Sequence, residues 1–273
     1  MKKVIVGICY DFDCTLARGY MQEFGLVQAL GMTADEFWAK NKENMKKTGT
    51  APVLSYTRLI IDECERRGIK LTRKFLNECG KNIEYFSGVK TWFKRLNEYA
   101  ASRGILLEHY IISSGNKEIL EGSEIYREFK DVFGCEYLFD KNGVAYWMKN
   151  IVDFTLKTQY LFKINKGVTG KDDSSKVNER IENKHIEFRN MIYIGDGYTD
   201  IPCMTLVKEK GGTSISVYTD EQKQISDGLV RDDRVNYACK ADYSAGSEMD
   251  KLLKLILDSI ALREKLIKKE NNQ

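Results

Sequence analysis

The stretch VIVGICYDFDCT, residues 4–15, decides the fold. Its first seven residues are apolar and rich in β-branched side chains, and the run ends in two carboxylates, Asp11 and Asp13. A short apolar run without alternation is typical of a strand buried on both faces of a parallel sheet. Ligands of such sheets bind beyond the carboxyl ends of the strands. The sequence therefore predicts that Asp11 and Asp13 lie at the edge of the sheet where a ligand binds.

Similar short apolar runs recur along the chain and alternate with helical patterns. Strands are expected at residues 105–112, 191–194 and 214–218, and an amphipathic helix is expected between Gly88 and Gly104. A helix capped by Ser247 is expected to close the chain. Strands that alternate with helices indicate the α/β class, with a Rossmann-like, doubly wound parallel sheet.

Two segments depart from this simple alternation. Residues 17–87 show helical periodicity with breaks and contain a plausible N-cap at Thr72, so they are expected to form an inserted α-helical cap. The catalytic core would then comprise residues 1–16 and 88–273. A small antiparallel β-hairpin is expected near residues 137–147, because turn residues separate two aromatic-rich flanks there. Residues 169–183 are expected to form a loop or an exposed helix.

Composition excludes several classes of protein. The 43 Lys and Arg residues nearly balance the 40 Asp and Glu residues, which argues against a nucleic-acid partner. The seven cysteines include no CxxC pair, so neither a disulfide framework nor a zinc site is expected. No apolar run is long enough to span a membrane, and carboxylates interrupt the apolar N-terminal run. We expect a cytoplasmic protein without a membrane partner, and the sequence leaves the oligomeric state open.

Four sets of polar residues follow apolar runs and are expected to converge on one cleft. Together they offer carboxylates, hydroxyls, backbone amides and a cation, which is the combination that phosphoryl transfer requires. Oxygen ligands alone suit Mg²⁺. The sets are Asp11, Asp13 and Thr15; then Ser113, Ser114 and Gly115; then Lys157; and finally Gly195, Asp196 and Asp200.

In their order, these four sets resemble the motifs of the haloacid dehalogenase superfamily, and most closely its phosphoserine-phosphatase-like branch. The resemblance implies that Asp11 forms an aspartyl-phosphate and that Asp13 protonates the leaving group and then activates water. It also implies that Ser113 and Lys157 hold the phosphoryl oxygens. The metal residues would be Asp11, Asp13 through its backbone carbonyl, Asp196 and, through waters or Lys157, Asp200. Thr15, Ser114, Gly115 and Tyr20 are further candidates for binding phosphate or substrate.

The resemblance also implies a reaction: Mg²⁺-dependent hydrolysis of a small-molecule phosphate monoester. The acidic Asp13 argues against dehalogenation, because dehalogenases lack an acidic residue at this place. The chain departs from phosphoserine phosphatases at one place, since it has Arg18-Gly-Tyr20 where they carry a Glu, and this argues against phosphoserine as the substrate. A phosphotransferase on the same core, or a silent module that binds metal or phosphate, remains as an alternative.

Several residue assignments stay open at this stage. Ser113 is preferred over Ser114, although either hydroxyl could cap the next helix. Lys157 competes with three neighbouring lysines that could equally be solvated: Lys149, Lys163 and Lys166. Cys14 is a weak candidate for a nucleophile, because no suitably placed histidine is evident. Tyr20 and Tyr198 are candidates for touching the substrate.

Overall fold

A computed structural model of the chain describes residues 4–168 and 174–270. Its centre is a seven-stranded sheet with the order β4-β3-β2-β1-β5-β6-β7, in which every neighbouring pair except β3 and β4 is parallel. The strands are β1 Val4–Tyr10, β2 Ile105–Asn116, β3 Asp131–Phe139, β4 Ala145–Asn150, β5 Met191–Gly195, β6 Thr213–Tyr218 and β7 Tyr237–Lys240. The predicted parallel α/β sheet is therefore confirmed, and so is the antiparallel hairpin.

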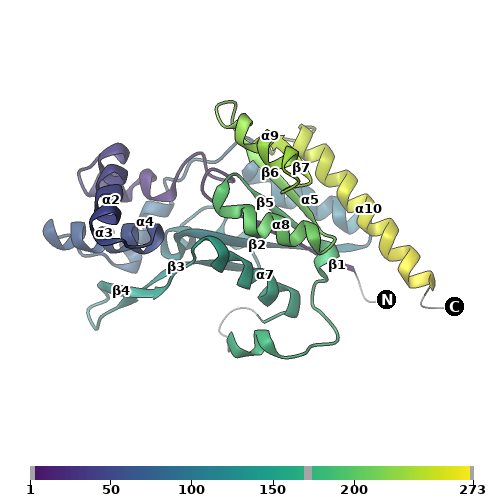
Figure 1. Ribbon diagram of the computed structural model, residues 1–273, viewed down its shortest axis with the longest axis horizontal. Coiled ribbons are helices and arrows are strands. Elements are labelled where there is room, and N and C mark those ends of the chain that lie inside the picture. Colours follow the sequence, from purple (N-terminus) through teal and green to yellow (C-terminus); the bar gives the residue numbers. More distant parts are fainter. Residues whose placement is uncertain (1–3, 169–173, 271–273) are drawn as a thin grey trace.

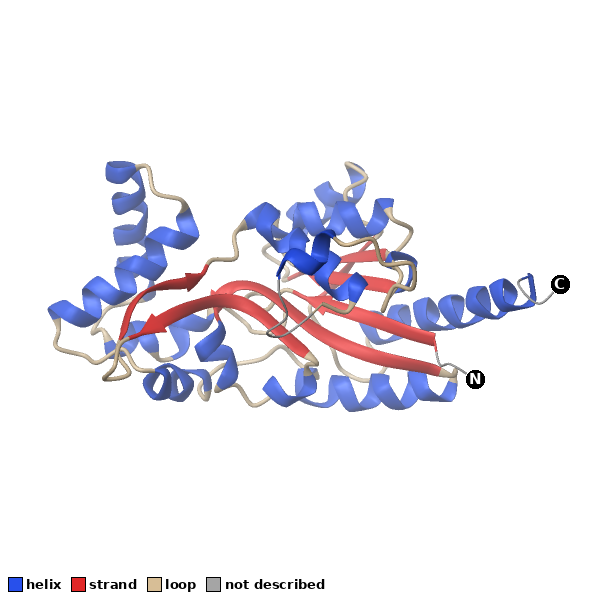
Figure 2. Cartoon of the chain, turned by 90° about the horizontal axis from the view of Figure 1, so that it is seen from below, coloured by secondary structure: helices blue, strands red, loops and turns tan. Residues whose placement is uncertain are grey.

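Helices cover both faces of this sheet (Figures 1 and 2). Helices α5 and α10 pack against each other, while α7 and α8 form a second pair beside β5 and β6. The helices are α1 Leu26–Ala29, α2 Ala34–Thr48, α3 Pro52–Arg66, α4 Arg73–Gly80, α5 Val89–Ser102, α6 Lys117–Glu121, α7 Lys157–Lys166, α8 Ile201–Glu209, α9 Lys223–Arg231 and α10 Glu248–Glu270. Short 3-10 turns occur at Met21–Phe24, Tyr126–Glu128, Phe154–Leu156, Ser174–Asn178, Phe188–Asn190 and Tyr198–Asp200.

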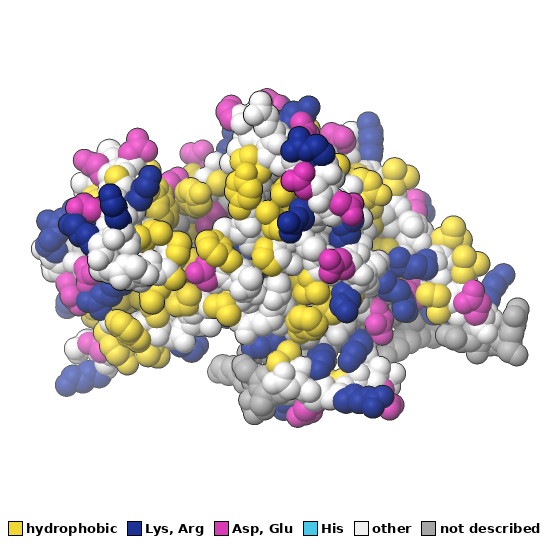
Figure 3. Space-filling view, viewed as in Figure 1, with side chains coloured by type: hydrophobic (Ala, Val, Ile, Leu, Met, Phe, Trp, Pro, Cys, Tyr) yellow, Lys and Arg dark blue, Asp and Glu magenta, His cyan; other side chains and the backbone are white. Residues whose placement is uncertain are grey.

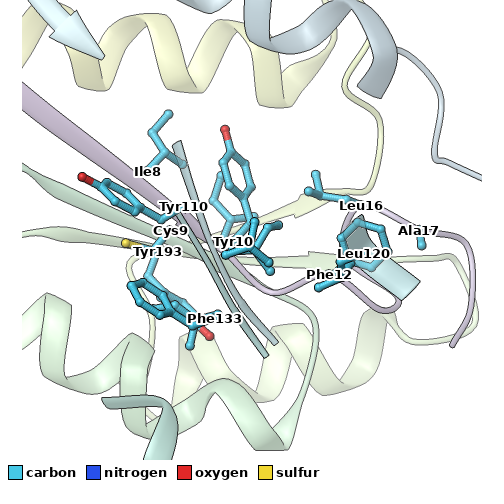
Figure 4. Close-up of a cluster of buried hydrophobic side chains, with 14 of the residues drawn as sticks. Ile8, Cys9, Tyr10, Phe12, Leu16, Ala17, Tyr110, Leu120, Phe133 and Tyr193 are labelled. Atoms are coloured by element: carbon cyan, nitrogen blue, oxygen red, sulfur yellow. The ribbon is translucent and has the colours of Figure 1, made fainter. Parts of the chain in front are cut away.

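The middle strand, β1, is buried from Val6 to Tyr10 among its sheet neighbours and the helices, while Val4 and Ile5 are half-buried (Figure 4). Tyr10, at its end, is fully buried and still satisfies its hydroxyl. Trp92 donates to that hydroxyl at 3.0 Å, and the hydroxyl is 3.0 Å from Nδ1 of His109. This buried chain of polar groups holds the strand end that leads into Asp11.

Helices α2, α3 and α4 lie beside the β3–β4 hairpin, at the end of the molecule away from both termini (Figure 1). The sequence starts these helices locally, since Thr33 forms a capping box with Glu36 and the Thr72 hydroxyl accepts from the N–H of Phe75 at 3.1 Å. The hairpin joins this group through the N–H of Ala145, which donates to the carbonyl of Leu71. The extent of the cap, residues 17–87, stays a prediction.

Some elements differ from the expectation. Strand β2 continues past Ile112 to Asn116 with an irregular register, because its last residues pair with β3 only at Cys135. Neither β7 nor α9 is expected from the sequence, since both are short and half exposed. Residues 174–178 form a 3-10 turn, while 169–173 of the expected loop lie outside the described residues.

Surface charge is mixed on the face shown in Figure 3, where basic and acidic side chains are interspersed. This matches the near-zero balance of the composition, with a formal net charge of +3. Among the described helices, none has the length and apolar character needed to cross a bilayer.

Candidate active site

Asp11 lies where β1 ends, at the floor of a cavity of about 660 Å³. Its backbone N–H donates to the carbonyl of Ile194 at 2.8 Å, so β5 holds it in place. Asp13, Lys157, Asp196 and, from the next strand over, Ser114 line the same cavity. All four sequence sets therefore contribute a residue to one cleft at the carboxyl edge of the sheet, as expected.

Lys157 is the buried cation of this cleft. Its Nζ lies 3.0 Å from a carboxylate oxygen of Asp11 and 2.7 Å from one of Asp200. Burial opposes the charged form, yet the two carboxylates outweigh it and raise the pKa of Lys157, so this ammonium stays protonated. The competing Lys149 instead pairs with Glu136 on the hairpin, and Lys166 donates to backbone carbonyls.

Asp200 is fully buried and its two carboxylate oxygens accept from four donors. Lys157 and the Tyr193 hydroxyl reach one oxygen at 2.7 Å each, while the backbone N–H groups of Asp196 and Gly197 approach the other at 3.3 and 3.5 Å. Because its oxygens are occupied in this way, Asp200 is placed to hold Lys157 and the loop that carries Asp196. Direct binding of a metal suits it less well than it suits Asp196.

Asp13 also faces the cavity, and one of its carboxylate oxygens accepts from the N–H of Met21 at 2.8 Å. Thr15 differs from its expected role, because it is fully buried and absent from the cavity wall. Its hydroxyl donates to Asp196 at 3.4 Å and its carbonyl accepts from Tyr243. Thr15 therefore orients Asp196 and does not reach a phosphate in the cavity.

The choice between the two serines is also altered by the geometry. Ser113 is fully buried, does not line the cavity and accepts a hydrogen bond from the N–H of Gly115 at 2.9 Å. Ser114 lines the cavity, and its hydroxyl has no hydrogen-bond partner among the described residues. Ser114 rather than Ser113 therefore lines the cavity, although the Ser114 hydroxyl oxygen is itself buried, and the expected phosphate-binding role of Ser113 stays a prediction. Gly115 does not line the cavity either.

The carboxylates of the site are crowded and buried, which shifts their protonation. Burial, and next the charge of Asp200, raises the pKa of Asp11 to about 7, although Lys157 opposes this. Burial and the charge of Asp11 raise the pKa of Asp13 well above its usual range. Burial, Asp200 and Asp11 do the same for the pKa of Asp196. A site that costs this much to ionise is one that a bound cation would stabilise.

The donor set fits a hard divalent cation. One carboxylate oxygen from each of Asp11, Asp196 and Asp200 lies within 4.8 Å of the other two. Oxygen ligands without nitrogen or sulfur suit Mg²⁺. Cys14 is close in sequence, but burial and then the neighbouring Asp196 raise the pKa of its thiol, which disfavours a thiolate there.

The opposite wall of the cavity is aromatic and amide-rich, and the sequence predicts only part of it. Tyr20 and Tyr198 both line the cavity, and their contact with a substrate stays a prediction. Further lining residues come from helices α2, α3 and α9, from the turns beside them and from core segments: Gln22, Trp38, Asn41, Pro52, Val53, Tyr56, Phe154, Gln222 and Ile225. On an amphipathic helix such residues are indistinguishable from core residues, so the sequence carries no signal for them.

Comparison with known proteins places this geometry in context. No protein-family model matches the chain. A curated relative, an uncharacterized protein of Borreliella burgdorferi, is 26% identical over 287 residues, which cover 94% of this chain and 97% of the relative.

Solved structures are similar over nearly the whole chain. A HAD family hydrolase from Salmonella enterica serovar Typhi has a TM-score of 0.59 at 19% identity and matches 93% of this chain and 72% of its own. A phosphoserine phosphatase, solved as an analogue of its phospho-aspartyl intermediate, has a TM-score of 0.55 at 16% identity, with 93% and 99% covered. A phosphoserine phosphohydrolase-like protein from Francisella tularensis has a TM-score of 0.51 at 19% identity, with 86% and 94% covered. These structures show the fold of the chain, which it shares with HAD family hydrolases and phosphoserine phosphatases.

Proposed function

We propose that this protein is a Mg²⁺-dependent phosphatase that hydrolyses a small-molecule phosphate monoester through an aspartyl-phosphate on Asp11. The observation that carries the proposal is the placement of Asp11 at the cavity floor, with the Lys157 ammonium 3.0 Å away and two further carboxylates, Asp13 and Asp196, lining the same cavity. A carboxylate can attack phosphorus only where nearby positive charge offsets the repulsion between two anions. The fold of the solved phosphatases adds support.

In the first step a carboxylate oxygen of Asp11 forms a bond to phosphorus as the ester P–O bond breaks. Asp13 gives its proton to the departing alcohol oxygen, a role that suits a carboxyl whose pKa is raised by burial and by the charge of Asp11. In the second step Asp13 takes a proton from water, whose oxygen attacks phosphorus. Inorganic phosphate leaves and the Asp11 carboxylate is restored.

The remaining residues hold charges in place. Lys157 offsets the negative charge that develops on the phosphoryl oxygens, and Asp200 fixes its position at 2.7 Å. The Ser114 hydroxyl is buried without a partner among the described residues, and it would donate to a phosphoryl oxygen once its side chain turns toward the cavity. Asp11, Asp196 and the backbone carbonyl of Asp13 would hold Mg²⁺, which would supply positive charge beside the phosphate.

The experiment is a steady-state assay of purified protein with Mg²⁺ on a generic aryl phosphate, comparing wild type with Asp11→Asn. We expect the substitution to lower kcat by at least about 10³-fold. Asp62→Asn, which changes an exposed carboxylate of α3, is the matched control and should retain activity. Acid-quenched Asp13→Asn protein should carry phosphate on Asp11, detectable by peptide mass spectrometry.

Each alternative predicts its own result. If the phosphoryl group appears on an added alcohol in preference to water, the protein is a phosphotransferase. If aryl phosphate is not turned over at all, the chain is a binding module and the hydrolase proposal is wrong. Undiminished activity of Asp11→Asn would exclude this residue as the nucleophile.

A further inference from the structure

Three aromatic rings form one wall of the cavity on the side of helices α2 and α3. The ring centroids of Tyr20 and Trp38 are 5.1 Å apart, and those of Trp38 and Tyr56 are 5.8 Å apart. All three side chains line the cavity that has Asp11 at its floor. We call these three residues the aromatic wall. It faces the space that the alcohol part of a phosphate ester must occupy once its phosphate lies beside Asp11.

Two buried amide side chains next to the aromatic wall offer acceptors without partners. Asn41 is 6% exposed and Gln22 is 1% exposed, and both line the cavity. The side-chain oxygen of each has no hydrogen-bond partner among the described residues. Their NH₂ groups are engaged instead, that of Gln22 with Asn116 at 3.0 Å and that of Asn41 with the sulfur of Met45 at 3.7 Å. Both oxygens are themselves shielded from solvent, so a ligand reaches them only when the two side chains rotate toward the cavity. A ligand that carries N–H or O–H groups would then supply the donors that they lack.

The charge of the cavity distinguishes between possible ligands. Lys157 is the one cation among the described residues that line it, and Asp11 and Asp200 already neutralise that cation. The other charged lining residues are acidic, and the Trp38 ring N–H donates to the carboxylate of Glu23 at 2.6 Å. A carboxylate on the alcohol part of a substrate would therefore find no cationic side chain there. An ammonium group would gain from the acidic surroundings and from the faces of the aromatic rings.

We propose that the aromatic wall, with Asn41 and Gln22, recognises the ammonium group of an amino-alcohol phosphate, a small ester with a cation a few bonds from its phosphate. This inference rests on the proposed phosphatase function and assigns its substrate class. The ammonium N–H groups satisfy the two unpaired amide oxygens, and the Trp38 ring stacks against the cation. The wall in this way selects against esters whose alcohol carries a carboxylate.

Three substrates test this selection because they differ by one group each. Ethanolamine phosphate carries the ammonium, propyl phosphate replaces it with an uncharged group of similar size, and phosphoserine adds a carboxylate to it. We expect kcat/KM for ethanolamine phosphate to exceed that for either of the other two by at least about 10-fold, since an unpaired charge or a lost cation contact costs that much. A nucleoside monophosphate is included as a planar, aromatic competitor.

Variants of the wall then test which residues carry the selection. Trp38→Leu should lower the ratio of kcat/KM for ethanolamine phosphate to that for propyl phosphate by about 5- to 30-fold. Asn41→Leu, which keeps the volume and removes the acceptor, should lower the same ratio. The matched control is Trp147→Leu on the hairpin, where the ring is 50% exposed and does not line the cavity; its ratio should equal that of wild type. Melting curves identify any variant that fails to fold. If Trp38→Leu does not fold, the test rests on Asn41→Leu.

The outcomes separate this inference from the proposed function. If aryl phosphate is hydrolysed through Asp11 but phosphoserine or propyl phosphate is used as well as ethanolamine phosphate, the substrate class is wrong and the phosphatase stands. Preference for the nucleoside monophosphate would likewise overturn the ammonium assignment. If aryl phosphate is not hydrolysed, the proposed phosphatase function itself is wrong. If the ratio of kcat/KM values is unchanged in both wall variants, the aromatic wall does not recognise the ammonium group.

Discussion

The hydroxyl of Tyr56 donates a hydrogen bond to the backbone carbonyl of Ser114 at 2.5 Å, which joins helix α3 to the end of strand β2. Tyr56 is 6% exposed, so water does not compete strongly for this bond. The contact couples the aromatic wall to the end of the strand that brings Ser114 to the cavity. The two halves of the cavity are therefore held in a fixed relation.

Removing this hydroxyl should weaken both stability and substrate binding. We expect Tyr56→Phe to lower the free energy of unfolding by about 1 kcal/mol, the net contribution of one hydrogen bond, and to raise KM. Chemical denaturation and steady-state kinetics measure the two effects. Tyr146→Phe removes a hydroxyl from an exposed ring on β4 and should change neither by a measurable amount. Equal effects of the two substitutions would contradict a specific role for the Tyr56 contact.

Gly195 permits the close approach of Asp200 to the end of β5. A Cβ atom at Gly195 would lie 2.5 Å from a carboxylate oxygen of Asp200, whereas one at Gly197 would meet nothing within 4 Å. Gly195→Ala should therefore displace Asp200 and with it Lys157, and we expect kcat on aryl phosphate to fall by about 10²-fold. Gly197→Ala, two residues away, is the matched control and should keep most of its activity. Similar activity of both variants would show that the position of Asp200 is not critical.

Mg²⁺ should stabilise the folded protein through the crowded carboxylates. At a concentration about 100 times its Kd, the ion adds about 2.7 kcal/mol to the free energy of unfolding, which thermal melting detects. We expect a chelator to reverse the rise in Tm. Asp196→Asn should abolish the rise, because it removes a cavity-facing ligand. Asp62→Asn should leave it intact, and an undiminished rise in Asp196→Asn would exclude that residue as a ligand.

His109 should make the protein sensitive to mild acid. Burial lowers the pKa of His109 to about 3, and the neutral ring lies 3.0 Å from the Tyr10 hydroxyl and 3.1 Å from the side-chain oxygen of Asn97. In the unfolded chain a histidine has a pKa of about 6.5, so between pH of about 6.5 and 3 the unfolded state binds the extra proton. Stability is thus fully present above about 6.5 and is lost as the pH falls, by up to about 1.4 kcal/mol per pH unit.

Urea denaturation at several pH values measures this slope in wild type and in His109→Gln. We expect the variant, which has no group that titrates at this position, to lose less stability between pH 6.5 and 4 than wild type does. Its stability at neutral pH should be lower, because glutamine cannot reproduce the ring contact with Phe93. An equally steep slope in both proteins would assign the acid sensitivity to other groups.

Much of the fold could be predicted, because many of its elements follow from local sequence patterns. The apolar run of β1, the Thr72 cap of α4 and the turn of the β3–β4 hairpin all depend on neighbours in the chain, and each occurs as expected. Strand β7 and helix α9 could not be predicted. Their apolar patterns are short, and their positions depend on tertiary contacts: β7 pairs with β6 in parallel, and α9 packs against both strands.

The residues of the candidate site likewise fall into those that could be predicted from the sequence and those that could not. Residue type and spacing, read together with a family resemblance, single out Asp11, Asp13, Lys157 and Asp196, and the structure gathers these four around one cavity. Thr15 and Ser113, in contrast, are fully buried and do not line the cavity. Both are hydroxyl residues next to strand ends, and their hydroxyls form hydrogen bonds within the protein, Thr15 with Asp196 and Ser113 with the N–H of Gly115. The direction of such a side chain cannot be predicted from its residue type.

By itself, the sequence determined the class of fold and the chemistry of the cavity floor. Strands end in polar residues wherever a parallel sheet binds a ligand, and that signal is local. Only the tertiary structure decided what faces that floor. Trp38, Asn41 and Tyr56 lie on amphipathic helices as ordinary core residues would, and packing turns them toward Asp11. The physical reason is that helical periodicity specifies which face of a helix is buried, but not whether protein or substrate covers it.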